Sequence, residues 1–249
     1  MSSLSKRRLS RRNFTGQLLV STATLAVQPG FSFGALAQTS SRPLRIGIIG
    51  SGRIGGAVGL RWAAAGHQIL FSSRNPDELA SLVAEAGPGA RSGFPQEAAE
   101  FGEVVFIAVP YAALPQVGRD YAAAMAGKIV IDCSNPYVQR DGPMAAEALE
   151  KGTGIASAEF VPGVRLTRAF NAIGFTSVAQ KHHRAGELVA IPVAGDDAEA
   201  VAVTSQLVRD AGFDPVVVGG LDQARRFDQG SAVYVKDLTA RELRAALNL

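Results

Sequence analysis

The glycine-rich segment that directly follows a short apolar run constrains the fold of this chain most. Residues 44–49 (LRIGII) are apolar and rich in β-branched side chains, which predicts a buried strand. An alanine-rich helix is predicted at 57–65 and ends at Gly66. A GxGxxG motif between a strand and a helix is typical of a turn that binds the pyrophosphate of a dinucleotide. The residues of this turn are Gly50, Ser51, Gly52, Arg53, Ile54 and Gly55.

Strands and helices alternate along the rest of the chain. Further strands are predicted at 68–71, 104–109, 128–132 and 166–170, and helices begin at 76 and 111. Strands that are apolar throughout belong to a parallel sheet covered on both faces. We therefore expect an α/β fold, a Rossmann-type doubly wound and mostly parallel sheet. The dinucleotide-binding domain is predicted at 38–174, and a small C-terminal α/β domain at 175–249.

The end of the second predicted strand indicates which cofactor the turn binds. An enzyme that uses NAD usually places a carboxylate here, which holds the ribose hydroxyls. This chain has Ser73 and Arg74 instead, a hydroxyl and a guanidinium that suit a 2′-phosphate. The pair favours NADP over NAD. In the alternative interpretation Arg74 is a solvated loop residue.

The residues expected at the carboxyl ends of the strands, where ligands bind in such sheets, include no histidine, lysine or carboxylate. Reduction of a simple ketone requires a proton donor, whereas hydride exchange between stacked rings mostly requires positioning. The composition therefore favours an aromatic redox acceptor, and no catalytic residue is assigned. Tyr111 either stacks on the substrate or begins a helix. The residues at these strand ends are Pro110, Tyr111, Cys133, Ser134, Asn135, Asn171 and Ala172.

The remaining chemically active side chains carry weaker signals. Cys133 is the only cysteine, so no intrachain disulfide can form, and we interpret it as a small apolar residue rather than a redox thiol. His182 and His183 lie in a polar stretch that we expect to be a solvated loop. No other cluster of metal-ligating residues supports a site around them, so no metal is predicted.

The N-terminus has the features of an export signal in the required order. Arg11 and Arg12 resemble a twin-arginine motif, a weakly apolar stretch follows, and Ala35-Leu36-Ala37 suits signal peptidase. Residues 1–37 are therefore expected to engage the twin-arginine translocase and direct the protein to the periplasm, without a stable membrane anchor. In the alternative interpretation they are a basic tail and the protein is cytoplasmic.

The distribution of charge argues against a nucleic-acid partner. Residues 1–37 hold five basic side chains and no acidic one, so the net charge of +3 for the whole chain becomes −2 for the remainder. A slightly acidic body lacks the electrostatic footprint of a nucleic-acid-binding protein. A small-molecule redox acceptor is the expected partner, and a homodimer is compatible with the sequence.

Together these motifs resemble the NADPH-dependent coenzyme F-420 reductases and their dinucleotide-binding relatives. The resemblance covers most of the chain after the leader, including Ala194-Gly195-Asp196-Asp197 and Gly212-Phe213-Asp214-Pro215. The segments that carry it are 46–56, 71–74, 104–111, 127–136, 166–173 and 193–219.

The resemblance implies an NADP(H)-dependent oxidoreductase whose acceptor is a deazaflavin such as F420, or a flavin such as FAD or FMN. It places phosphate contacts on residues 51–54, 2′-phosphate contacts on Ser73 and Arg74, and the nicotinamide beside residues 109–111. The rival interpretations are a non-catalytic NADP-binding or redox-sensing module, and an imine or ketone reductase. The predicted NADP contacts are Gly50, Ser51, Gly52, Arg53, Ile54, Gly55, Ser73, Arg74, Val109, Pro110 and Asn135. The predicted substrate pocket is Tyr111, Asn171 and Ala172.

Overall fold

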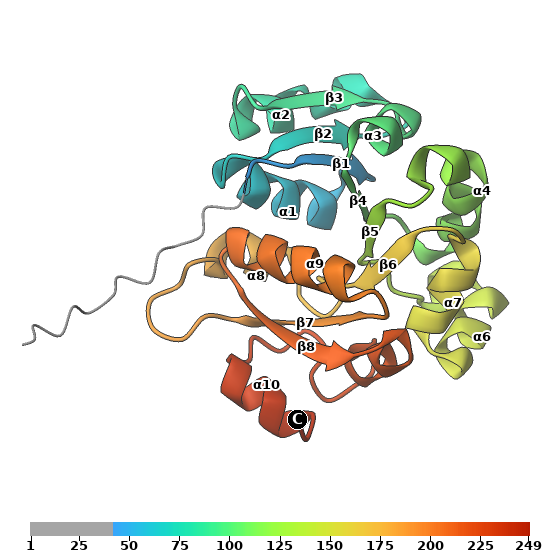
Figure 1. The fold of residues 1–249 in the computed structure, drawn as a ribbon, viewed down its shortest axis with the longest axis vertical. Helices are drawn as coiled ribbons and strands as arrows, with labels where there is room; N and C mark the ends of the chain where they lie inside the picture. The colour runs from blue at the N-terminus through green and yellow to red at the C-terminus, as the bar shows by residue number, and fades with distance from the viewer. Residues whose placement is uncertain (1–41) are drawn as a thin grey trace, which may run out of the picture. The chain divides into compact units, whose positions relative to one another are not determined.

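The computed structural model describes residues 42–249, which form one compact unit. The predicted leader at 1–37 lies outside these residues. A single eight-stranded sheet in the order β3-β2-β1-β4-β5-β6-β7-β8 runs through the unit (Figure 1). All neighbouring strands are parallel except β6 and β7. The strands are β1 (Arg45–Ile49), β2 (Gln68–Ser72), β3 (Ala90–Gly93), β4 (Val104–Ile107), β5 (Ile129–Asp132), β6 (Arg165–Arg168), β7 (Ala190–Gly195) and β8 (Asp214–Gly219).

Helices cover both faces of this sheet, as the predicted fold class requires, and that prediction is confirmed. Helices α1, α8 and α9 pack on one face, and α3, α4 and α7 on the other. The α-helices are α1 (Arg53–Ala64), α2 (Ala80–Ala86), α3 (Pro95–Phe101), α4 (Leu114–Met125), α5 (Val138–Asp141), α6 (Pro143–Lys151), α7 (Thr153–Phe160), α8 (Phe175–Lys181), α9 (Ala198–Asp210) and α10 (Ala240–Ala246). The 3₁₀ helices are η1 (Pro76–Leu79), η2 (Tyr111–Ala113) and η3 (Leu221–Phe227).

The apolar character of the strands follows from burial on two sides. Ile46 and Ile48 of β1 enter the core under α1, whereas Ile49 enters the core on the opposite face. Successive side chains of a strand point to opposite faces, so a strand with both faces covered is apolar at nearly every position. Trp62 joins α1 to α9, because its indole N–H donates to the carbonyl of Leu207 at 2.7 Å.

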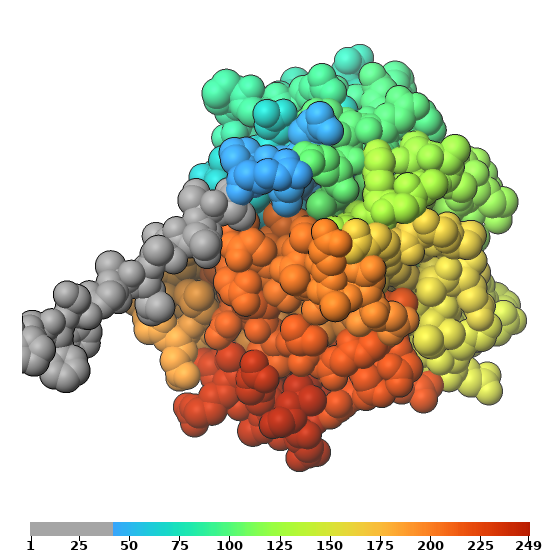
Figure 2. All heavy atoms as spheres, in the orientation of Figure 1, coloured from blue at the N-terminus to red at the C-terminus, as the bar shows by residue number. Residues whose placement is uncertain are grey.

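The C-terminal residues do not form a domain of their own, which corrects the predicted boundary between 174 and 175. Strand β7 pairs antiparallel with β6, with Thr167 opposite Gly195, and β8 continues the same sheet. Side chains of β7 share one core with those of β1. In the space-filling view the orange and red residues pack directly against the yellow and green ones (Figure 2). The predicted second domain is therefore the far edge of the first.

Several short elements are not predicted from the sequence, namely strand β3 and helices α3, α5, α6, α7 and α8. Strand β3 has an exposed and polar pattern at the sheet edge, so it lacks the apolar signal of the central strands. Among residues 42–249, no helix combines the length and apolar character that crossing a bilayer requires.

Candidate functional site

The carboxyl ends of four parallel strands, β1, β4, β5 and β6, lie at one level and create the site. Ile49 of β1 pairs with Ile107 of β4, Ile107 with Asp132 of β5, and Asp132 with Arg168 of β6. The loops after these strands therefore start side by side. The strand order reverses direction between β1 and β4, and ligands of doubly wound sheets bind in the crevice at such a point.

The glycine-rich turn after β1 has the geometry of a phosphate cradle. Gly50 has a φ of 95°, which disfavours a side chain, and a Cβ on Gly55 would lie 2.1 Å from the Gly50 carbonyl. A Cβ on Gly52, by contrast, would meet no heavy atom within 4 Å. No side chain caps α1 and its first turn has no acidic residue, so the positive end of the helix faces open space. An anionic diphosphate fits these features.

The two serines of the predicted cofactor site shape its backbone. The Ser51 hydroxyl accepts from the Ser72 N–H, and the Ser51 N–H donates to the Ser72 carbonyl, both at 2.9 Å. The Ser73 hydroxyl accepts from the Asn75 N–H at 2.8 Å. The Arg74 side chain is exposed and has no hydrogen bond or ion pair with any other residue in 42–249. Its guanidinium therefore remains available beside the turn.

A cavity of about 490 Å³ opens at the same edge of the sheet. Six predicted site residues line it, namely Arg53, Ile54, Val109, Pro110, Asn135 and Asn171. The other lining residues, which were not predicted as site residues, include Tyr137, Arg140, Phe170, Phe175, Tyr234 and Val235. The Arg53 guanidinium lies 5.3 Å from the ring centre of Phe175, so α1 and α8 meet at the cavity wall.

Two residues of the predicted substrate pocket do not line the cavity. Tyr111 is fully buried, with its hydroxyl 3.3 Å from the Ser157 hydroxyl, and burial raises its pKa to about 12. Tyr111 begins η2, so the helix interpretation describes it. Ala172 packs in the core beneath β8, and its carbonyl accepts from the Val235 N–H at 2.9 Å.

The surroundings of Cys133 and His182 indicate packing and hydrogen bonding rather than a reactive thiol or a metal site. Cys133 lines the cavity but is 95% buried, and burial followed by the nearby Asp132 raises its pKa far above the usual value. It therefore stays a thiol. His182 is not simply solvated, because its Nε2 lies 2.6 Å from the Arg61 Nη1, and burial with this charge lowers its pKa. Within residues 42–249, no three histidine, cysteine or carboxylate side chains gather as a metal site.

Two asparagines present polar groups that the protein itself does not satisfy. Asn135 donates through its Nδ2 to the main-chain carbonyl of Asn171 at 2.8 Å. The Asn135 Oδ1 and both polar side-chain atoms of Asn171 are buried and have no partner within the described chain. Phe170 precedes Asn171 with a φ of 62°, an uncommon conformation for a bulky residue that clusters at functional sites. The orphaned amide groups favour a polar ligand at this wall of the cavity.

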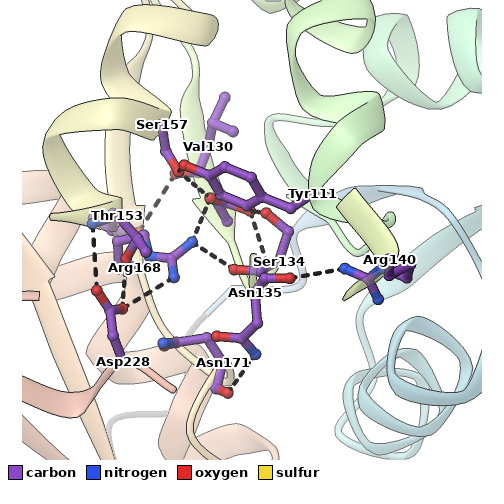
Figure 3. Close-up of polar contacts among 12 residues, drawn as sticks. Tyr111, Val130, Ser134, Asn135, Arg140, Thr153, Ser157, Arg168, Asn171 and Asp228 are labelled. Carbon is purple, nitrogen blue, oxygen red and sulfur yellow. Dashed lines mark hydrogen bonds and ion pairs between the residues drawn. The ribbon is translucent and has the colours of Figure 1, made fainter. Parts of the chain in front are cut away.

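A buried ionic network lies behind this wall (Figure 3). The fully buried Arg168 guanidinium contacts the Asp132 carboxylate at 2.5 Å and the Asp228 carboxylate at 3.5 Å. It also donates to the Ser134 carbonyl at 2.9 Å, and the Ser134 N–H donates to Asp132 at 2.9 Å. Thr153 donates through its hydroxyl to Asp228. The network fixes the turn that carries Asn135 into the cavity.

A doubly wound sheet with a glycine-rich turn at its switch point and an adjoining cavity defines a Rossmann-type nucleotide-binding oxidoreductase. Residues 45–136 match the sequence model of the family described as NADP oxidoreductase, coenzyme F420-dependent. The sequence-based predictions of the family and of its enzyme class, an NADP-dependent oxidoreductase, are thereby confirmed.

Individual relatives agree with this assignment. The chain is 31% identical over 202 residues to metalloreductase STEAP3 of Rattus norvegicus, which covers 79% of this chain but only 38% of that relative. It is 27% identical to the F420-dependent NADP reductase of Methanothermobacter marburgensis, over 73% of this chain and 87% of the relative. The crystal structure of a hypothetical protein from Sinorhizobium meliloti superposes with a TM-score of 0.70 and 25% identity, over 81% of this chain and 97% of that chain.

The first test concerns the turn. Gly52→Val is expected to abolish dinucleotide binding and to leave the fold intact, because a Cβ at this position meets no heavy atom within 4 Å and the side chain would occupy the open space in front of α1. Fluorescence titration with NADPH and circular dichroism would measure the two effects. Normal NADPH affinity in a folded variant would show that the pyrophosphate binds elsewhere.

Proposed function

We propose that this protein transfers a hydride between NADP(H) and an aromatic redox ring of the deazaflavin or flavin type. The observation that carries the proposal is the cavity beside the glycine-rich turn, whose wall includes aromatic side chains and the orphaned amide groups of Asn135 and Asn171. Such a slot positions two rings and excludes water, which is most of what hydride exchange requires of a protein.

The residues around the turn fit NADP(H) in particular. The N-terminus of α1 would hold the pyrophosphate, and Ser73 and Arg74 lie after β2, where a 2′-phosphate is recognised in this fold. Arg53 lines the cavity next to the turn and adds a second positive charge. NADPH supplies a hydride when it is bound. The protein's part is to orient the cofactor, and the orphaned amides of Asn135 and Asn171 would bind polar groups of either ring.

The names of the relatives support acceptors of two kinds. One relative is an F420-dependent NADP reductase and another is a metalloreductase. A ferric ion takes one electron at a time, so its reduction by a two-electron hydride donor would require a flavin between them. Both kinds of reaction therefore place an aromatic ring in the cavity, and this shared feature is why the proposal names the ring and not the final oxidant.

Turnover with a panel of acceptors tests the proposal directly. The purified protein is expected to oxidise NADPH, measured at 340 nm, with F420, FMN, FAD or 5-deazariboflavin, and to reduce a ferric chelate only when a flavin is added. NADPH binding without turnover on any acceptor would indicate the non-catalytic binding module instead. Turnover only with imines or ketones would indicate an imine or ketone reductase.

Arg74→Ala tests the cofactor preference. The exposed guanidinium has no partner among the described residues, so its removal is expected to weaken NADPH binding by about tenfold or more, through loss of a charge-assisted contact, and to leave NADH binding nearly unchanged. Titration with both nucleotides would measure the difference. Arg91→Ala, which removes an arginine that stacks on Phe101 away from the cavity, provides the matched control. Equal losses for NADPH and NADH would show that Arg74 does not contact the 2′-phosphate.

We also propose that residues 1–37 direct the protein through the twin-arginine translocase to the periplasm. The support is the order of Arg11-Arg12, the apolar stretch and Ala35-Leu36-Ala37 in the sequence. Replacing Arg11 and Arg12 by lysine keeps the charge but removes the guanidinium pair, and is expected to retain full-length protein in the cytoplasm. Cell fractionation with N-terminal sequencing would decide. A parent protein that is itself cytoplasmic and starts near Met1 would favour the basic-tail interpretation.

A further inference from the structure

A segment from the far end of the chain completes the cavity beside the loop after β5. Tyr234 and Val235 line it together with Tyr137 and Arg140. Val235 has a φ of 49°, a costly conformation for a β-branched residue, and its N–H is anchored on the Ala172 carbonyl at 2.9 Å. Strain that the surrounding structure maintains at a cavity wall marks this segment as part of the site.

The hydroxyl oxygens of Tyr137 and Tyr234 are 2.5 Å apart. This contact joins two side chains that are 97 residues apart in the sequence, and both line the same cavity. One of the two hydroxyls donates in this bond. The other keeps its own proton available for a third group, and the cavity is the place where that group would lie.

The surroundings of the pair indicate that Tyr234 holds its proton tightly. The Arg140 guanidinium lies 4.8 Å from the ring centre of Tyr137, and contacts with the Asp141 carboxylate at 2.7 and 2.9 Å hold it there. This geometry places a positive charge over the ring on which proton donation would leave a phenolate. Burial, and after it the hydrogen bond with Tyr137, raises the pKa of Tyr234, whereas the Arg140 charge acts weakly in the opposite direction. When Tyr137 gives up its proton, Tyr234 therefore keeps its own and donates to the Tyr137 oxygen.

We propose that Tyr137 is the proton donor to the redox acceptor and that Tyr234 is the residue that positions it. This inference rests on the proposed function. A neutral deazaflavin or flavin that takes a hydride gains two electrons and becomes negatively charged along its N–C=O edge. The O–H bond of Tyr137 breaks, and its proton passes to that edge. The phenolate then regains a proton from water through Tyr234. Overall, NADPH, one proton and the oxidised ring react to give NADP⁺ and the dihydro ring.

Two acceptors of different charge separate proton donation from ring positioning. Neutral 5-deazariboflavin requires a proton after hydride uptake, whereas the N-methylacridinium cation becomes neutral and requires none. Tyr137→Phe is expected to slow reduction of 5-deazariboflavin by about 10²-fold, the lower range for general acid catalysis, and to leave acridinium reduction above background unchanged. Tyr234→Phe is expected to give a smaller loss with the same acceptor dependence. Tyr121→Phe, whose hydroxyl has no hydrogen bond to another described residue, is the control.

Binding without NADP(H) supplies a readout that does not depend on turnover. At a pH above the pKa of its N1–H, the reduced 5-deazariboflavin is an anion and should bind wild-type protein more tightly than the oxidised form, because Tyr137 donates a hydrogen bond to its charged edge. In Tyr137→Phe the ratio of the two dissociation constants is expected to fall by about tenfold or more, while NADPH affinity is retained. An unchanged ratio, or equal losses with both acceptors, would overturn the inference and leave the proposed function standing. A wild-type protein inactive with every acceptor would overturn both.

Discussion

The site depends on one buried guanidinium. Arg168 lies at the end of β6 with no exposed surface, and its charge is compensated by Asp132 from β5 and Asp228 from the segment after η3. Burial lowers the pKa of an arginine, but the two carboxylates raise that of Arg168 by more, so it stays charged. Removal of one partner from a buried ion pair costs about 3–5 kcal/mol, because the other charge is left without compensation. The ends of β5 and β6 and the start of α7 are thus held together.

The two sides of the loop after β5 differ in how their polar groups are satisfied. On the side away from the cavity, Asp132 accepts from Ser134, Ser157 and Arg168. On the cavity side, the Asn135 Oδ1 and the Asn171 amide have no partner within the described chain. An unsatisfied buried polar group costs about 1–3 kcal/mol. The Arg168 Nε in the network also lacks a partner, but Asn135 and Asn171 line the cavity, where a ligand can satisfy their polar groups. The rigidity of the first side holds the orphaned groups in place.

One part of the candidate site consists of residues that directly follow strands in the sequence, and this part could be predicted from sequence patterns alone. The turn from Gly50 to Gly55 and the Ser73-Arg74 pair follow predicted strands directly, so strand order and a motif sufficed to place them. Sequence patterns could not place Tyr234 and Val235, because their position results from β7 and β8 joining the main sheet, and no spacing in the sequence encodes that pairing. The prediction that Tyr111 lines the substrate pocket was wrong, although its position in the chain was local and easy to predict. Tyr111 follows a strand end as expected, but η2 turns its ring into the core.

The tyrosine pair changes the argument for the acceptor. The residues that sequence analysis placed at the strand ends include no histidine, lysine or carboxylate, which favoured a ring over a ketone. Tyr137 supplies a hydroxyl that could serve either acceptor, so the absence of those side chains no longer distinguishes a ring from a ketone.

The preference for a ring now depends on how well its polar edge pairs with the orphaned asparagine groups. The Asn171 amide offers one donor and one acceptor side by side, and the Asn135 Oδ1 adds a second acceptor. A lone carbonyl can use only the donor and would leave both acceptors buried without partners, whereas the N–H and C=O edge of a flavin or deazaflavin can pair with the amide as a unit. Unpaired polar groups penalise the wrong ligand more strongly than extra contacts reward the right one, so the amides favour a ring that carries an amide edge.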